Sequence, residues 1–562
     1  MKRIFLVMLA ALAMLVLAAP TSAQPAEGIF TPTECPFEIP ANADTPIDCG
    51  FLTVPQNRAD PASGTIDLAV AILGSRSATP APDPIIYLEG GPGGSALVGV
   101  EGWYDLPLLD TREMILFDQR GTGYSQPSLD CPGIEESEDL DTDLPACRAD
   151  LVAQGVDLDA YTSAESAADV NALREALGYD QVNLLGISYG TRLGLTVMRD
   201  YPDSVRAAIL DSVYPPDVDT NYVAVPELWG MLNALFADCA ADAACNAAFP
   251  DLQNRFFAAV DGLIAEGADP ETGEPFEFDE LYVYGQVYQQ FFNGQAFSAP
   301  AAFDALINGD YDTYLQLAVI GAEPGLPGGG EGGAVDYFVE ADLFLAELPD
   351  EPFFEIDDLV FAGDRDGLVA LLENEYGYFP EDSGPMADII FEILMGELEL
   401  DMGGEMAEAD PNNDGDSYGM NLSVQCAEEL PFMDVDTGVN EALAFGVSED
   451  FIEATYAYSE FADCQVWNVA PAPAFENDPV VSETPTLLFS GEYDPATPPS
   501  WGDLAAASLP NSTHIVFPRQ GHSLITTIGP CGGEIAVAFL DNPTVPPPTT
   551  CADVFDQPFF IP

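Results

Sequence analysis

Short apolar runs that end in turns recur along the first part of the chain. Residues 65–73 (TIDLAVAIL) alternate between apolar and polar positions, which predicts a strand with one buried face. Residues 83–91 (DPIIYLEGG) and 112–121 (REMILFDQRG) are continuous apolar runs that end in glycine turns. Runs of this kind are typical of strands buried on both faces of a parallel sheet.

Strand and helix patterns then alternate. Residues 163–179 and 189–202 have helical spacing, and they flank the strand-like runs 181–188 (QVNLLGIS) and 205–216 (VRAAILDSVYPP). The same alternation of strand and helix patterns occurs again between about 484 and 540. This alternation predicts an α/β fold whose central sheet is mostly parallel.

The middle of the chain lacks this alternation. Residues 254–269 (NRFFAAVDGLIAEGAD) and 386–400 (MADIIFEILMGELEL) have the spacing of amphipathic helices, and 323–333 (EPGLPGGGEGG) reads as a flexible loop. We therefore expect a mainly helical cap inserted into the α/β domain. The expected division is a leader at 1–23, a first core part at 24–216, the cap at 217–480 and a second core part at 481–562. We expect the proline-rich end of the chain to lie on the surface, tied down by Cys551.

The N-terminus has the layout of a secretory signal peptide. Lys2 and Arg3 precede an uncharged apolar run at 4–19, and a small residue, Ala23, ends the segment. A retained membrane anchor is the alternative, but the apolar run is short for a span. We expect a secreted or periplasmic protein with no stable membrane span after cleavage.

Ten cysteines follow the leader, and none forms a Cys-x-x-Cys motif. With only two histidines in the chain, we expect no zinc site, and we expect disulfides because the protein is predicted to be exported. Sequence alone leaves the connectivity open. The simplest scheme joins neighbours in order: Cys35–Cys49, Cys131–Cys147, Cys239–Cys245, Cys426–Cys464 and Cys531–Cys551.

The net charge is −81, from 95 acidic and 14 basic residues. Such a surface repels nucleic acid, which excludes it as a partner. We interpret the charge as a solvated surface, the alternative being attraction of cationic substrates. The segment Asp410–Asn421 (DPNNDGDSYGMN) resembles a calcium loop in its first half, but Asn421 stands where a bidentate Glu is expected. We interpret it as an acidic loop and expect no metal.

The segment Gly186–Gly190 (GISYG) fits the nucleophile-elbow pattern Gly-x-Ser-x-Gly between a strand and a helix. In such a turn the serine hydroxyl is exposed at the end of the strand, while the glycines avoid clashes with neighbouring backbone. The pattern is weak alone, because it recurs by chance, and its context strengthens it. Ser188 is the candidate nucleophile.

A serine nucleophile needs a base and an orienting acid. His514 lies inside a strand-like run and is expected to be structural, whereas His522 follows it in a loop and is the candidate base. Asp494 lies just past a strand, one element before His522, and is the preferred acid. Asp211, at the end of another strand, is the alternative. Both keep the chain order serine, acid, histidine.

The oxyanion hole is expected to consist of backbone N–H groups. One is that of Tyr189, directly after the nucleophile. The second is expected from the glycine-rich loop at 87–96 (YLEGGPGGSA), where Gly91 is the candidate donor because Pro92 has no N–H. A phosphate-binding loop is excluded, because the Lys-Ser/Thr ending is missing.

These motifs occur together in the order GGPGGS, DQRGTGYS, GISYGTRLG, LDSVYPP, GEYDPATP and GHS. In that order the chain resembles the α/β-hydrolase peptidases of the proline iminopeptidase and tripeptidyl aminopeptidase group. The segment CGFLTVPQNR and the cysteines after His522 are similar to the secreted tripeptidyl aminopeptidase branch. Glu89 departs from the pattern, since iminopeptidases usually carry a histidine there.

The resemblance implies an α/β-hydrolase fold and a serine aminopeptidase that forms an acyl-enzyme on Ser188, with His522 as base and Asp494 as acid. No metal or organic cofactor is implied. Cap carboxylates bind the free amine in related iminopeptidases, and Glu428 and Glu429 beside Cys426 are the candidates, with two surface acids as the alternative. The substrate is expected to be a peptide or a small acyl compound. An esterase on the same scaffold is the alternative function; an inactive exported binding protein is a third.

Overall fold

The computed structural model describes residues 28–320 and 417–561 apart from gaps at 133, 135–139, 219, 262, 269–274, 446, 448–451, 453–460 and 556–557, together with positions 368, 371 and 372. The expected leader at 1–23, the loop at 323–333 and the helix at 386–400 lie outside the described residues. Among the residues that are described, no helix is long and apolar enough to cross a bilayer.

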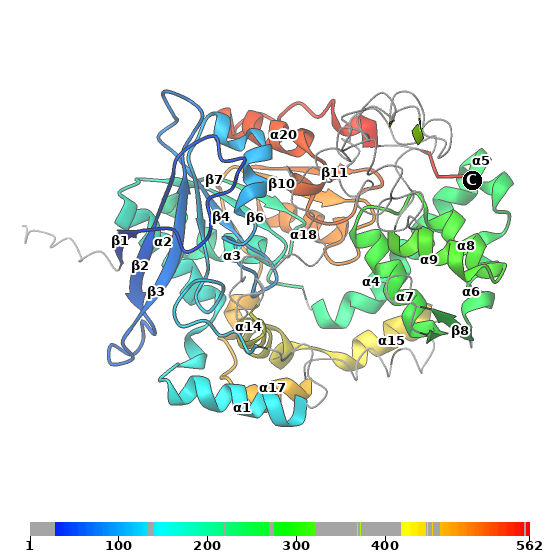
Figure 1. Ribbon diagram of the computed structural model, residues 1–562, viewed down its shortest axis with the longest axis horizontal. Coiled ribbons are helices and arrows are strands. Elements are labelled where there is room, and N and C mark those ends of the chain that lie inside the picture. Colours follow the sequence, from blue (N-terminus) through cyan, green and yellow to red (C-terminus); the bar gives the residue numbers. More distant parts are fainter. Residues whose placement is uncertain are drawn as a thin grey trace, which may run out of the picture.

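One nine-stranded sheet organises the fold, in the order β1-β2-β3-β5-β4-β6-β7-β10-β11 (Figure 1). The last six strands in this order are parallel, as the alternating pattern predicts, whereas β1, β2, β3 and β5 pair antiparallel. The strand expected at 65–73 is confirmed, but its antiparallel pairing and the two strands before it were not anticipated. The strands are β1 (Ile29–Thr33), β2 (Ile47–Pro55), β3 (Thr65–Leu73), β4 (Ile85–Leu88), β5 (Met114–Phe117), β6 (Val182–Ile187), β7 (Val205–Asp211), β10 (Thr486–Gly491) and β11 (Ser512–Phe517).

Helices cover both faces of this sheet. The helices α2 (Ser163–Leu177), α3 (Tyr189–Asp200) and α18 (Pro499–Ser508) pack on one face, and α20 (Pro530–Asp541) packs on the other. Successive residues of β4 enter opposite cores, with Ile86 on the α3 side and Tyr87 on the α20 side. This alternation follows from the two-residue period of a strand, and it explains why buried parallel strands are apolar throughout.

Between β7 and β10 the chain forms a largely helical insertion, seen beyond the β10–β11 end of the sheet in Figure 1. Its core contains packed aromatic rings, among them Phe236, Phe256 and Phe303. One expected helix is shorter than its pattern predicts, since α6 ends at Val260 and 264–268 form a strand that pairs with 275–279. The elements are α4 (Thr220–Ala241), α5 (Ala243–Ala248), α6 (Leu252–Val260), β8 (Ile264–Ala268), β9 (Pro275–Asp279), α7 (Glu280–Phe292), α8 (Ala299–Ile307) and α9 (Tyr311–Leu315).

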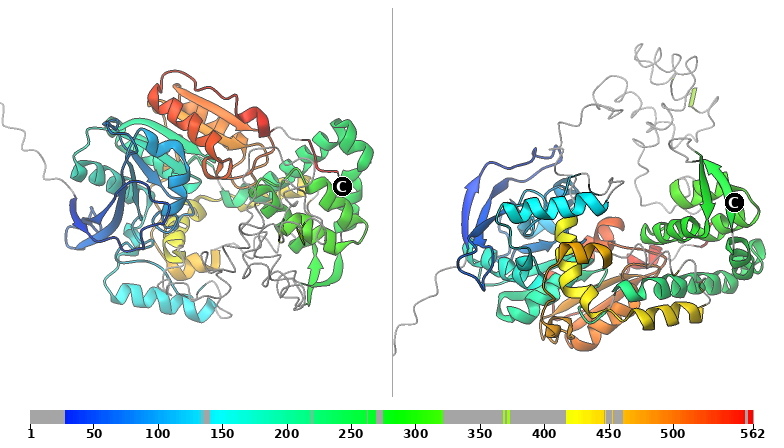
Figure 2. Two further views of the ribbon diagram at one scale, coloured as in Figure 1. Left: turned by 45° about the horizontal axis from the view of Figure 1, so that its top comes forward. Right: turned by 90° about the horizontal axis from the view of Figure 1, so that it is seen from below.

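A second group of insertion helices packs elsewhere. The helix α17 (Phe461–Trp467) lies against α1 (Leu140–Ala153), which precedes the insertion in the chain (Figures 1 and 2). The helix α14 (Tyr418–Val424) packs on α17 and shares one apolar core with both helices. The helix α15 (Val435–Phe445) instead packs on α4. The second group therefore joins α1 of the α/β domain to α4 of the insertion.

Five disulfides join the ten cysteines in sequence order, as in the simplest scheme. Two of them, Cys131–Cys147 and Cys426–Cys464, border the core shared by α1, α14 and α17. The proline-rich tail is largely exposed and is tied down by the Cys531–Cys551 disulfide, as expected, but two residues near its end are not at the surface. Phe559 and Phe560 are buried, and the Phe560 N–H donates to the Phe297 carbonyl at 3.0 Å, because these rings complete the apolar core of the insertion.

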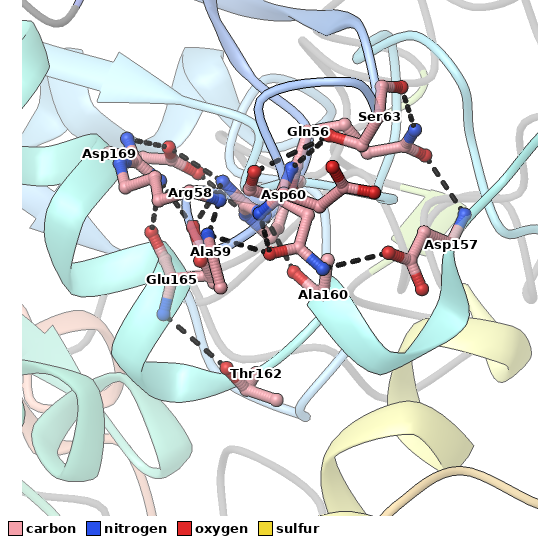
Figure 3. A network of polar contacts seen from close by, with 12 residues as sticks. Gln56, Arg58, Ala59, Asp60, Ser63, Asp157, Ala160, Thr162, Glu165 and Asp169 are labelled. Carbon is pink, nitrogen blue, oxygen red and sulfur yellow. Dashed lines mark hydrogen bonds and ion pairs between the residues drawn. The ribbon is translucent and has the colours of Figure 1, made fainter.

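A buried ionic network joins the early strands to α2 (Figure 3). The Asp169 carboxylate accepts from Arg58 at 2.7 Å and from Arg120 at 2.8 Å, and both Arg120 and Asp169 are fully buried. Arg120 also donates to two backbone carbonyls, so its charge and its N–H groups are both satisfied. Such pairing is the condition under which a buried arginine is tolerated. The network fixes the loop after β5, which carries Asp118.

Candidate active site

Ser188 occupies a strained turn between β6 and α3. Its φ is +56°, a region that non-glycine residues rarely adopt. A Cβ on Gly186 would lie 2.4 Å from the Gly190 carbonyl oxygen, and a Cβ on Gly190 would lie 1.9 Å from that of Leu88. Only glycine fits at both positions, which accounts for the Gly-x-Ser-x-Gly motif. Ser188 itself remains partly exposed.

The structure brings His522 and Asp494 together. The His522 Nδ1 lies 2.8 Å from Asp494 Oδ2, and both side chains are buried. Asp494 also accepts from the backbone N–H groups of Ala496 and Thr497 and from the Thr497 hydroxyl, which lies 3.2 Å from His522 Nδ1. Burial alone would lower the pKa of His522, but the charge and hydrogen bond of Asp494 and the charge of Asp211 raise it above its ordinary value. Asp494 therefore orients the imidazole and favours its protonated form.

The insertion contacts this histidine directly. The Phe292 ring, at the end of α7, stacks on the imidazole with ring centroids 4.4 Å apart. The backbone N–H of His522 donates to the backbone carbonyl of Phe292 at 2.8 Å. The Tyr493 hydroxyl, next to Asp494, donates to Asp238 on α4. Sequence reasoning missed these contacts, because no local pattern relates residues more than 200 positions apart. Ser188 and His522, both within the described residues, are not hydrogen-bonded to each other. Such bonds are often long or absent before substrate binds.

The glycine-rich loop after β4 lies against the nucleophile. A Cβ on Gly90 would lie 3.2 Å from Ser188 Cβ, and Gly91 has a φ of +103°. Asp118 shapes this loop by accepting from the Ser95 hydroxyl and the Leu97 N–H. Burial raises the pKa of Asp118 to about 6, against the lowering effect of these bonds. The Asp118 role was also missed, although the position directly after β5 is a signal for it.

The N–H groups of Gly91 and Tyr189 are available as donors. Neither donates to an acceptor among the described residues, whereas the Gly90 N–H is taken by the Glu89 carboxylate at 2.8 Å. Tyr189 is the first residue of α3, where N–H groups have no partner within the helix. The second insertion group supports the loop from outside, since the Ser417 N–H donates to the Gly93 carbonyl at 3.0 Å.

A second hydrogen-bonded set of serine, histidine and aspartate is formed by Ser490 on β10, His514 on β11 and Asp503 on α18. The His514 Nε2 is 3.0 Å from Ser490 Oγ, and its Nδ1 is 3.0 Å from Asp503 Oδ1. Ser490 is fully buried, and a Cβ on Gly502 would lie 2.8 Å from its hydroxyl oxygen. No substrate carbonyl fits between them, so these contacts join α18 to the sheet. Triad-like hydrogen bonding alone does not define an active site.

Glu428 and Glu429 are buried beside α3 rather than exposed. Glu428 accepts from the Ser163 N–H at 2.6 Å and from the Ser163 hydroxyl at 2.7 Å. Arg192, one turn after the nucleophile, lies 2.6 Å from a Glu429 oxygen and 3.4 Å from a Glu428 oxygen. The Ser163 hydroxyl also bonds the Tyr189 hydroxyl at 2.8 Å. Both carboxylates thus have protein partners.

No group of three or more His, Cys, Asp or Glu side chains within the described ranges has the arrangement of a metal site. The acidic loop Asp410–Asn421 lies outside the described residues up to Asp416.

Two families match the chain. The family described as alpha/beta hydrolase fold matches residues 83–246, and the family described as TAP-like protein matches residues 450–551. The first match contains the turn at Ser188, and the second contains Asp494 and His522. Together with the sheet order, these matches define an α/β hydrolase.

The chain is also similar to several known proteins. The chain is 33% identical over 201 residues to a tripeptidyl aminopeptidase of Streptomyces coelicolor, which covers 32% of this chain and 37% of that protein. It is 23% identical over 526 residues to the serine protease Hip1 of Mycobacterium bovis, covering 89% of this chain and 86% of the relative. The chain therefore spans little more than a third of the aminopeptidase it matches. A solved proline iminopeptidase from Mycobacterium smegmatis is 14% identical, covering 84% of this chain and 92% of that one at a TM-score of 0.33.

Proposed function

We propose that the protein is an exported serine peptidase that cleaves short peptides from free N-termini through an acyl-enzyme. The hydrogen-bonded pair of Asp494 and His522 carries this proposal, since the two residues follow β10 and β11 of the same parallel sheet in which Ser188 follows β6. Relatives named tripeptidyl aminopeptidase and serine protease support the peptidase class. Five disulfides support an oxidising compartment outside the cytosol.

In this proposal Ser188 Oγ attacks the scissile carbonyl while His522 Nε2 takes its proton. The oxyanion that forms accepts hydrogen bonds from the backbone N–H groups of Gly91 and Tyr189. The imidazolium then donates its proton to the leaving amine, and a water activated by the same histidine hydrolyses the acyl-enzyme. Asp494 holds the imidazole through Nδ1, so that Nε2 faces the serine.

A fluorophosphonate probe tests the nucleophile. We expect it to label the full-length protein, and we expect Ser188→Ala to abolish labelling while Ser490→Ala retains it. The second variant removes the other histidine-bonded serine and so is the matched control. Absence of labelling in the native protein, or labelling that survives in Ser188→Ala, would overturn the proposal.

The substrate class needs a panel. p-Nitroanilides of one, two and three alanines, each with free and acetylated amino ends, are compared with p-nitrophenyl acetate. We expect the free-amine peptides to have the highest kcat/KM. Hydrolysis of the ester with no turnover of any anilide would assign the scaffold to an esterase instead.

Amine recognition by Glu428 and Glu429 stays a prediction, and their pairing with Arg192 supplies a competing expectation. If they bind the substrate amine, replacing each with Gln raises KM for free-amine peptides and leaves the ester unaffected. If they only stabilise the fold through Arg192, the same variants lower the melting temperature and reduce the turnover of all substrates alike. The acetylated peptides and the ester separate these outcomes.

A further inference from the structure

Asp211 is a buried carboxylate that the proposed mechanism does not use. It ends β7 and is fully buried, yet it makes no hydrogen bond to the imidazole of His522. Its oxygens instead accept backbone N–H groups of the two residues that begin the short helix after His522. Oδ1 accepts from Leu524 at 3.1 Å, and Oδ2 accepts from Ile525 at 2.6 Å.

The neighbouring Ser212 adds a third contact of the same kind. Its hydroxyl accepts the Ser523 N–H at 2.8 Å and donates to Asp211 Oδ1 at 3.3 Å. Three consecutive N–H groups directly after His522 are thus bound by two consecutive side chains at the end of β7. Ser212 and Ser523 both have positive φ, at +58° and +57°, so each backbone turns sharply at this junction. N–H groups at a helix start have no partner within the helix, and these side chains satisfy them.

The same residue also holds the nucleophile. The Asp211 carbonyl oxygen accepts the Ser188 N–H at 3.0 Å, next to the last residue pair of β6 and β7. Asp211 is therefore joined to the Ser188 elbow through its backbone and to the His522 segment through its carboxylate. The two segments are more than 300 residues apart in the chain, and they carry the two groups between which a proton must pass.

We propose that Asp211, assisted by Ser212, is a positioning residue that sets the placement of His522 relative to Ser188. This inference rests on the proposed function and deepens it. Small displacements of a base relative to its nucleophile are costly, since about 1 Å can reduce the rate by about 100-fold. Asp211 also acts through its charge, which together with that of Asp494 favours the imidazolium.

The charged groups around His522 determine in which direction the acid limb of kcat/KM moves when Asp211 is replaced. The ionisable side chains that act on it are Asp494 beyond β10 and Asp211 on β7, while α7 presents the uncharged ring of Phe292 and Tyr288 near Asp494. Removing the negative charge of Asp211 lowers the pKa of His522. The acid limb of kcat/KM, which reports deprotonation of the base, then moves to lower pH.

Two variants separate placement from charge. Asp211→Asn removes the charge and one of the acceptors, so we expect a 10- to 100-fold lower kcat, by an order-of-magnitude estimate, and an acid limb at lower pH. Ser212→Ala removes one acceptor and keeps the charge, so we expect a smaller loss of kcat and an unmoved acid limb. KM should change little in both, and Ser490→Ala on the adjacent strand is the control.

The assay uses the full chain with trialanine p-nitroanilide, and rates are normalised to active sites titrated with the fluorophosphonate. If both variants keep the native kcat per active site and the native pH profile, the inference fails while the proposed function stands. If the native protein neither labels nor turns over, the proposed function itself fails. Should Asp211→Asn yield no folded protein, Ser212→Ala decides, and a native kcat per active site in that variant overturns the inference.

Discussion

The Phe292 ring lies parallel to the His522 imidazole, with an angle of 21° between their planes and 4.4 Å between their centroids. Phe292 belongs to the insertion and His522 to the second core part, so a cap residue covers one face of the proposed base. An aromatic face attracts a cation stacked on it. In the proposed mechanism, the imidazolium formed during proton transfer is therefore stabilised by a residue of the insertion.

Replacing Phe292 tests this contact. We expect Phe292→Leu to lower kcat by about 2- to 30-fold, which corresponds to about 0.5–2 kcal/mol of lost stacking. The acid limb of kcat/KM should move to lower pH, because the protonated histidine loses a stabilising contact. Phe292→Tyr keeps an aromatic face and should retain most of the activity. Equal losses in both variants would contradict a role for the ring.

Each of the two histidines is hydrogen-bonded to an aspartate, so the two aspartates, Asp494 and Asp503, can be compared by the same substitution. We expect Asp494→Asn to reduce kcat by about 10⁴-fold, because the imidazole loses the partner that fixes its tautomer. Asp503→Asn breaks the corresponding bond to His514 and should leave kcat within about twofold of native, since Ser490 is inaccessible. A comparable loss in both variants, at equal active-site content, would argue against the assignment.

Stability should rise as the pH falls from 8 to 5. Burial raises the pKa of Asp118 and Asp211 to about 6 and that of Glu476 to about 7, and the pKa of His522 is also raised. Each group binds its proton more tightly in the folded state, so its stabilising effect is present at low pH and is lost as pH rises through the folded pKa. Asp83, whose pKa is lowered, acts in the opposite sense only near and below its ordinary value of 3.8.

Melting temperatures across this range, at fixed ionic strength, provide the measurement. The net charge of −81 acts in the same direction through repulsion, which salt screens. Repeating the series in 1 M NaCl therefore isolates the buried groups, because burial is little affected by salt. A melting temperature that stays constant or falls toward pH 5 in high salt would contradict the expectation.

The disulfides should differ in what they contribute. Cys426–Cys464 closes a separation of 38 residues, and Cys239–Cys245 closes a separation of six. By chain entropy, replacing the first pair with serines should lower the free energy of unfolding by roughly 4 kcal/mol and the second by roughly 2 kcal/mol. Denaturant unfolding of the two double variants measures the difference. A larger loss from the short loop would show that native-state contacts dominate over chain entropy.

Local patterns account for most of the parallel half of the fold. The runs that form β4, β5, β6, β7 and β10 are mainly apolar because strands buried on both faces exclude most polar side chains. The edge strand β11 is partly exposed and begins with three polar residues. Gly186 and Gly190 identify the Ser188 turn because any Cβ there would clash with backbone. The structure has the nearest-neighbour pairing of the cysteines, which was the simplest of the schemes that the sequence left open.

Long-range packing decided the rest. The antiparallel strands β1 and β2 and the β8–β9 hairpin depend on partners elsewhere, which a local hydrophobic pattern does not specify. The pairing of Glu428 and Glu429 with Arg192 joins residues more than 230 positions apart. Among 95 acidic residues, no local sequence pattern distinguishes a carboxylate at the surface from one that is buried against an arginine.

The sequence by itself determined the nucleophile turn, the order of the three proposed triad residues and the choice of His522 over His514, because each depends on local geometry at a strand end. Only the tertiary structure decided which acid contacts the histidine and what the other one does. Asp211 ends β7 and Asp494 follows β10, and because these strands are parallel neighbours in one sheet, both residues reach the same edge. Their roles differ because one carboxylate meets the imidazole ring, while the other meets the backbone N–H groups that follow it.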